Sequence, residues 1–249
     1  MKIKNILIFL FIFMFRGLFA ANSIGDTSQT PLLTNLTVLA AVALLPFVIM
    51  LLTSFLKMIV VFSLLRNALG VQQTPPNQVL NGIALLLTIY VMFPTGLAMY
   101  TASQDVINKT PPTQIFSDQS ANYIIAIIDK AKEPMRTFLL KNTASKHIQS
   151  FYQIAERVFP PPYKSELKPN DFIIIIPSFI TSQLKAAFEI GVLIYLPFFV
   201  IDIVTSNILL AMGMMMLSPL TISLPIKLLL LVMIDGWTIL VQGLILSFR

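Results

Sequence analysis

Six charged side chains lie inside or beside long apolar segments of the sequence, namely Lys57, Lys185, Glu189, Asp202, Lys227 and Asp235. A charge in lipid is costly, so each is expected to pair or to face protein or water. Carboxylates within a membrane often build proton or ion relays. The alternative is a set of salt bridges that holds the subunits of an assembly in register. We favour salt bridges, because no segment carries several carboxylates in helical succession.

The spacing of these charges predicts one pair. Lys185 and Glu189 are four residues apart, share a helix face and can pair. Lys227 and Asp235 are eight residues apart, which puts them on one face but two turns from each other. Asp235 is therefore expected to need a partner on another segment or subunit.

No pattern in the sequence indicates catalysis. The chain has no cysteine, which excludes disulfides and thiolate metal sites. Its one histidine, His147, stands in a polar region and is expected to be structural or solvated. There is no phosphate-binding glycine loop and no metal-binding pair of histidines. We expect neither an enzyme nor a cofactor or metal site.

A methionine tract, Met212, Met214, Met215 and Met216, stands between two apolar segments. Gly213 and the pair Ser218-Pro219 mark it as a bend or a broken helix end. Methionine is flexible and polarizable, so the tract makes an adaptable apolar surface. It either faces lipid, fills a core, or lines a pore that seals around passengers of different shapes.

The composition is that of a multi-spanning membrane protein. The 249 residues are 56% hydrophobic and 11% charged, with a mean hydropathy of +0.83, whereas a soluble domain has roughly 25% charged residues. The net charge of +6 is scattered without a lysine or arginine run. This distribution argues against nucleic-acid binding.

The segments predict an all-α fold of long, proline-broken helical hairpins. Residues 1–21 read as a signal peptide, with an uncleaved anchor as the alternative. The first apolar hairpin is 36–102, where Gly70 suits a helix C-cap and Pro75-Pro76 a helix restart. Residues 103–171 are polar and predict a small helical domain.

Residues 172–249 predict the second hairpin, with the methionine tract at its bend and Pro219 after it. Pro177 and Pro197 are expected to cut its first segment, and Pro94 to interrupt 79–102. Four crossings behind a cleaved signal peptide put the connector 57–78 in the cytoplasm and 103–171 in the periplasm of a bacterial inner membrane.

Five ordered motifs together resemble one known family. They are Leu65-Arg-Asn-Ala-Leu-Gly70 with Pro75 to Gly82, Ser178 to Gly191 (above all Thr181 to Phe188), Leu196 to Asp202, the methionine tract with Ser218-Pro219, and Leu224 to Lys227 followed by Ile234 to Trp237. The sequence resembles the FliP/SctR family, the export-gate membrane proteins of flagellar and virulence type III secretion systems. Residues 103–171 carry no recognisable motif.

The resemblance implies a channel subunit that passes unfolded proteins across the inner membrane. It implies a ring of roughly five copies in a helical stack with FliQ/SctS-like, FliR/SctT-like and FlhB/SctU-like proteins, lifted toward the periplasm and in contact with membrane lipid. Met212, Met214, Met215 and Met216 then look like the family's pore gasket, which fits soft apolar side chains that gate by dewetting.

Two features depart from a simple assignment. Gln183 stands where the family usually has an acid, and Glu189 supplies an acid instead. Gln72-Gln73, Asn81-Gly82 and the ending Gly243 to Leu246 look like the virulence branch, whereas the apparent signal peptide looks like the flagellar branch. The rival functions are a proton- or ion-coupled secondary transporter that uses the charged pairs, and a scaffold whose pore belongs to other subunits.

Overall fold

The computed structural model describes residues 40, 43–44, 46–71, 74–108, 118–164, 166–214 and 216–248, and for 118–122 and 124 the backbone alone. The predicted signal peptide, Gln72-Gln73 and Met215 lie outside the described residues.

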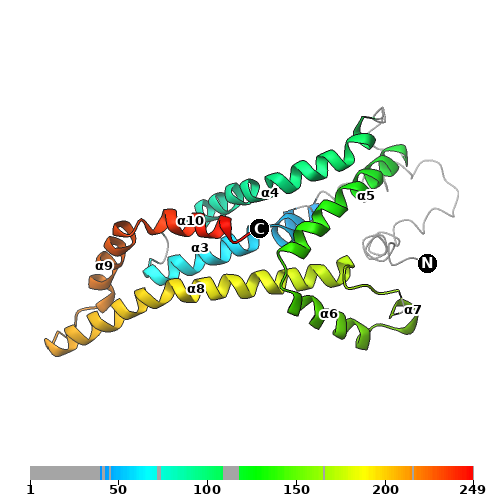
Figure 1. Cartoon of the computed structure of the whole chain (residues 1–249). Coiled ribbons are helices and arrows are strands. Elements are labelled where there is room, and N and C mark those ends of the chain that lie inside the picture. The colour runs from blue at the N-terminus through cyan, green and yellow to red at the C-terminus, as the bar shows by residue number, and fades with distance from the viewer. Residues whose placement is uncertain are drawn as a thin grey trace. The chain divides into compact units, whose positions relative to one another are not determined.

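Every regular element among the described residues is a helix (Figure 1). The order along the chain is a short helix Pro46–Leu52, α3 (Phe55–Leu69), α4 (Asn77–Ile107), α5 (Asp118–Lys141), α6 (Ser145–Val158), α7 (Pro161–Lys164), α8 (Phe172–Ala211), α9 (Pro219–Met233) and α10 (Gly236–Leu246). The prediction of an all-α protein is confirmed.

Two of these helices, α4 and α8, are long and apolar enough to cross a membrane. The number rises to four if each bent pair counts as one span: Pro46–Leu52 with α3, and α9 with α10. The axes of α9 and α10 differ by 62° at their break. These helices confirm the prediction of a membrane-type protein.

The prolines do not divide the long apolar segments as expected. α8 is one helix of 40 residues that contains both Pro177 and Pro197, and α4 is one helix of 31 residues that contains Pro94. The expectation that these prolines cut their segments is therefore wrong. A proline removes one backbone hydrogen bond, and a long apolar helix tolerates that loss when its neighbours supply compensation.

The chain forms two compact units. Unit 1 holds the described residues up to Leu52 and Phe93–Ser182, and unit 2 holds those of Thr53–Met92 and Gln183–Arg249. The boundaries between the units fall between the short helix and α3, inside α4 and inside α8. The division into 36–102, 103–171 and 172–249 stays a prediction about domains.

Unit 2 is built around α3. Met58, Val61 and Phe62 of this helix are almost fully buried. Around them pack Leu80 and Ala84 from α4, Ala187 from α8 and Leu244 from α10. Each partner helix contributes an apolar position, so α3 forms the core of the unit.

Unit 1 joins α5, α6 and α7 to the first turns of α8. The rings of Phe138 in α5 and Phe179 in α8 lie 6.0 Å apart. Ala155 of α6 and Ile174 of α8 belong to one buried cluster. The backbone N–H of Ala144, which precedes α6, donates to Ser182 Oγ at 3.1 Å. These contacts fix α6 against α8.

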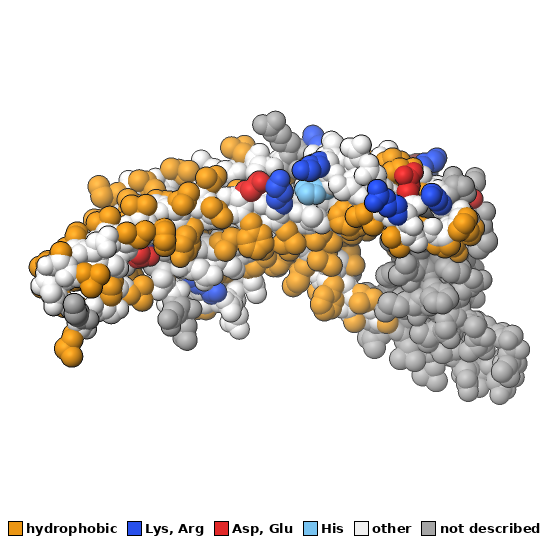
Figure 2. All heavy atoms as spheres, turned by 90° about the horizontal axis from the view of Figure 1, so that it is seen from below, with side chains coloured by type: hydrophobic (Ala, Val, Ile, Leu, Met, Phe, Trp, Pro, Cys, Tyr) orange, Lys and Arg blue, Asp and Glu red, His pale blue; other side chains and the backbone are white. Residues whose placement is uncertain are grey.

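Hydrophobic side chains are spread along the face drawn in Figure 2, and most of the lysine and arginine side chains visible on it gather in one region. Exposed large apolar side chains are frequent on α4, α8, α9 and α10, four of the helices that qualify as spans or parts of spans. A single soluble chain rarely exposes so much continuous apolar surface.

Candidate functional site

The methionine bend, residues 212–218, connects α8 to α9. Gly213 adopts a left-handed backbone with φ of 74°. Its N–H donates to Leu210 O at 3.1 Å, and the N–H of Met214 donates to Leu209 O at 3.0 Å. These two bonds form a Schellman motif, the standard glycine-dependent end of a helix. α9 then begins at Pro219, where a proline is favoured at the first helical position.

The methionines of this bend are exposed. The exposed fractions are 61% for Met212, 40% for Met214 and 104% for Met216. Met215 lies outside the described residues. The three described methionines therefore do not fill a core within this chain. They present flexible apolar side chains at the end of a two-helix hairpin.

A second connector joins α3 to α4. Gly70 is the C-cap of α3, with φ of 78°, and its N–H donates to Asn67 O at 3.1 Å. Pro75 and Pro76 stand just before α4. Arg66 donates through Nη1 to Pro75 O at 3.5 Å and to the side chain of Asn77, so it ties the end of α3 to the start of α4.

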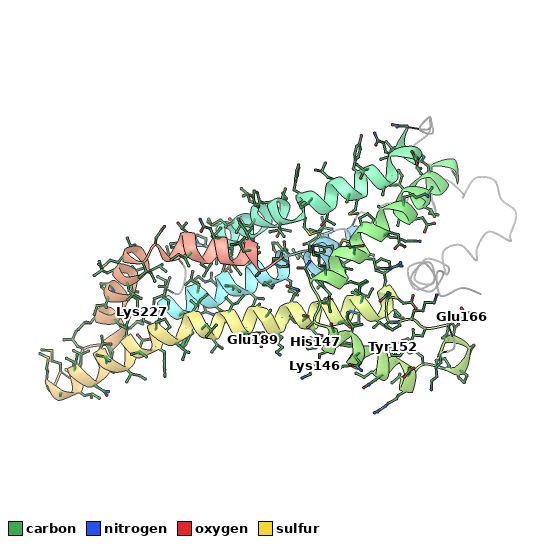
Figure 3. All side chains as sticks on the ribbon, viewed as in Figure 1. Lys146, His147, Tyr152, Glu166, Glu189 and Lys227 are labelled. Atoms are coloured by element: carbon green, nitrogen blue, oxygen red, sulfur yellow. The ribbon has the colours of Figure 1, made fainter. Side chains whose placement is uncertain are left out.

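Lys227 is a buried cation on α9, the helix that follows the methionine bend. Figure 3 labels it on α9, where this helix comes beside the end of α3. Its Nζ lies 2.6 Å from Asp202 Oδ2 on α8 and donates to Ala68 O on α3 at 3.0 Å. The Lys227 side chain is 2% exposed, whereas that of Asp202 is 36% exposed. A carboxylate and a carbonyl together satisfy an ammonium group that water cannot reach.

Lys57 is the second buried lysine of unit 2. Its Nζ donates to Ser247 Oγ at 3.3 Å and lies 4.0 Å from the ring centroid of Phe248. Among the described residues it forms no ion pair with a carboxylate. An aromatic ring and a hydroxyl are its partners, which is a cation–π arrangement at the opposite end of α3 from Lys227.

The remaining charges are on the surface of unit 2. Lys185 Nζ lies 3.5 Å from Glu189 Oε1, and both side chains are more than half exposed. Asp235 caps α10 in a left-handed conformation, with φ of 51°, and Asp235 Oδ1 accepts from Thr238 Oγ1 at 2.8 Å. Within the described part of the chain, no cation forms an ion pair with Asp235.

Sequence reasoning singled out Asp202 and Lys227 but did not pair them. They are 25 residues apart on separate helices, and no local pattern relates them. It also missed the Ala68 carbonyl and the Ser247 hydroxyl, because any residue supplies a carbonyl and serine is common. Among the described residues, no group of three histidines or carboxylates could hold a metal ion.

Comparison with known proteins identifies relatives along most of the chain. The FliP family matches residues 38–244. The Yop proteins translocation protein R of Yersinia pestis is 47% identical over 213 residues, which are 85% of this chain and 94% of that protein. The hypersensitivity response secretion protein HrcR of Ralstonia nicotianae is 42% identical over 84% of this chain and 94% of its own length.

A flagellar relative matches as well. The flagellar biosynthetic protein FliP of Pectobacterium carotovorum is 40% identical over 224 residues, which are 90% of this chain and 81% of that protein. The family consists of secretion-apparatus components rather than enzymes, which confirms that prediction. With a family match over more than 200 consecutive residues, 38–244, and relatives above 40% identity along 84% or more of its length, this chain belongs to the FliP family.

Proposed function

We propose that this chain is the pore-forming subunit of a type III secretion export gate in the bacterial inner membrane. Secretion and translocation are named in its relatives, and family membership implies self-assembly within the export apparatus. Its identity of 47% to the Yop translocation protein and 40% to the flagellar protein supports a virulence system. Its passengers are unfolded secreted proteins.

The methionine bend is the proposed gasket, and its exposure is the observation that carries this proposal. Side chains exposed by 40% or more at the tip of a hairpin are available to a lumen that several copies enclose. Unbranched thioether side chains adapt to one another and to a passing polypeptide. An apolar constriction of this kind excludes ions by dewetting and still opens when a polypeptide passes through it.

Assembly with other chains fits the lengths of the helices. At 1.5 Å per residue, the 40 residues of α8 extend about 60 Å, about twice the hydrocarbon thickness of a bilayer. A straight α8 cannot be covered by lipid alone. We propose that further copies, in a ring of roughly five, and FliQ/SctS-like, FliR/SctT-like and FlhB/SctU-like proteins cover the rest.

The polar helices α5, α6 and α7 are proposed to face the periplasm. Their exposed charges, such as the pair between Arg136 and Glu133 at 2.8 Å, suit an aqueous surface. Exposed ion pairs of this kind are common on solvated helices and carry little energy. Labelling of a cysteine placed in α6 by a membrane-impermeant reagent on whole cells tests this orientation, and protection from the reagent contradicts it.

The gasket is tested by replacing Met212, Met214 and Met216 together with serine in the complex that is co-expressed with its chromosomal neighbours. The expected result is ion leakage through an assembled complex, measured as conductance in planar bilayers, with assembly checked by native mass spectrometry. The matched control is Met233→Ser, because Met233 is 77% exposed but lies at the end of α9, outside the bend.

The chemistry of the seal is tested by a second variant that replaces the same methionines with leucine. Leucine keeps the apolar surface but is branched and less adaptable, so we expect a tight seal with reduced secretion of passenger proteins. An assembled serine variant with unchanged conductance, or equal leakage from Met233→Ser, contradicts the gasket.

A further inference from the structure

Lys227 joins the two arms of the methionine bend. Asp202 stands on α8, before the bend, and Lys227 stands on α9, after it. Their charged atoms lie 2.6 Å apart, which is the distance of a strong charge-assisted hydrogen bond. The ion pair therefore closes the base of the hairpin whose tip carries the methionines.

The same ammonium group also holds the end of α3. Lys227 Nζ donates to Ala68 O at 3.0 Å in a buried setting. The last four carbonyls of a helix have no partner within that helix and carry partial negative charge. Lys227 satisfies one of them, so one nitrogen atom connects α3, α8 and α9.

The first turn of α9 rests on the cap of α3. A Cβ atom built on Gly70 would lie 3.0 Å from Leu220 Cδ1 and 4.0 Å from Lys227 Nζ. Leu220 is the second residue of α9 and lies two residues after the bend. The cap of α3 therefore lies close to both the start of α9 and the buried cation.

We propose that Lys227 is the positioning residue of the methionine bend. Apolar contacts between helices are non-directional and permit sliding, whereas bonds from one nitrogen to Asp202 and to the Ala68 carbonyl fix the direction of both arms. Buried polar groups that set the register of helices are a known use of such pairs. The consequence for sealing rests on the proposed gasket, but the placement of the arms does not.

Spin labels test the placement directly, because the chain contains no cysteine. Leu210→Cys on α8 and Leu229→Cys on α9 replace side chains that are 59% and 60% exposed. The labelled chain is diluted with unlabelled copies in the assembled complex, and the distance between labels is measured by double electron–electron resonance. We expect one narrow distance, and a shifted or broadened distribution in Lys227→Met.

Lys57→Met is the matched control. Lys57 is also buried in unit 2, but its partners are Ser247 and Phe248 at the other end of α3. Its loss is expected to leave the distance between the labels unchanged. The variant Asp202→Leu/Lys227→Met leaves no unpaired charge, so it assembles even where Lys227→Met does not. It is expected to show the same broadening.

Conductance separates this inference from the proposed function. Broadening in both Lys227 variants together with increased leakage supports positioning and the gasket. Broadening without leakage from an assembled complex supports positioning and refutes the gasket. An unchanged distance in the double variant, or an equal change in Lys57→Met, overturns the positioning role.

Discussion

Gly70 and Gly213 provide a comparison in which backbone strain and side-chain contact can be separated. Both are left-handed, with φ of 78° and 74°. A Cβ atom on Gly70 would meet Leu220 Cδ1 at 3.0 Å, whereas one on Gly213 would have no neighbour within 4 Å in the described part of the chain beyond its adjoining residues. Alanine at either position strains the backbone, but only at Gly70 does it also push a neighbour.

The expected magnitudes follow from these two terms. A left-handed alanine costs about 1–2 kcal/mol, and the loss of glycine's freedom in the unfolded chain returns about 0.4–1 kcal/mol. Gly213→Ala is therefore expected to destabilise by about 1 kcal/mol. Gly70→Ala is expected to lose about 1 kcal/mol more, because its Cβ atom crowds Leu220. This is the low end of the cost of overpacking, since Leu220 is 43% exposed and can move aside.

Asparagine isolates the contact, because it tolerates the left-handed region but carries a Cβ atom. We expect Gly213→Asn to be nearly neutral and Gly70→Asn to keep the loss of about 1 kcal/mol. At about 2–4 °C per kcal/mol for a chain of this size, the two variants differ measurably in melting temperature.

The assay is thermal unfolding of the detergent-purified chain, followed by the fluorescence of its single tryptophan. Trp237 reports on unit 2, since its ring centroid lies 6.3 Å from that of Phe62. Adding Leu220→Ala to Gly70→Asn should remove the extra destabilisation of Gly70→Asn relative to Gly213→Asn. Equal melting temperatures for Gly70→Asn and Gly213→Asn, or no recovery with Leu220→Ala, would refute the reasoning.

Two further predictions concern single side chains. Lys185→Met breaks an ion pair with Glu189 that is more than half exposed, so it should cost less than about 1 kcal/mol in detergent; a loss as large as that of Lys227→Met in the same tryptophan assay contradicts this. In α6, the hydrogen bond to Glu156, followed by desolvation and the charge of Glu156, raises the pKa of Tyr152 above its ordinary 10.0. The stabilisation from this raised pKa is present below pH 10 and disappears as the pH rises through the raised value. Glu156→Ala should lower the pKa of Tyr152 toward the ordinary value in an ultraviolet titration read against Tyr152→Phe, and an unchanged titration rules out the carboxylate as the cause.

The helix ends at glycine and proline residues could be predicted from the sequence. Gly70 and Gly213 each end a helix in the left-handed conformation, and α9 begins at Pro219. These signals act within a few residues, because a cap or a turn satisfies its own backbone groups locally. The same kind of local signal gave a wrong prediction at Pro177 and Pro197, which do not end a helix. There the apolar sequence on both sides sustains the helix through a missing hydrogen bond.

The partners of the buried lysines could not be predicted from such local signals. Lys57 meets Ser247 across 190 residues of sequence, and Lys227 meets Ala68 across 159. Charge in an apolar segment predicted that each lysine needs a partner. It did not predict which partner, because that depends on how α8, α9 and α10 pack around α3. An aromatic ring or a backbone carbonyl satisfies a cation without leaving an acidic residue in the sequence.

The distribution of polar groups in unit 2 also bears on what surrounds the chain. Two buried threonine hydroxyls bond to carbonyls of their own helices: Thr88 Oγ1 donates to Ala84 O at 2.6 Å, and Thr205 Oγ1 donates to Ile201 O at 2.9 Å. Both buried lysines have partners inside the unit. Meanwhile Leu193, Leu229 and Val232 are 60% exposed or more. Where such apolar side chains form the surface, unit 2 gains nothing from contact with water. Lipid and further apolar helices are the surroundings that stabilise it.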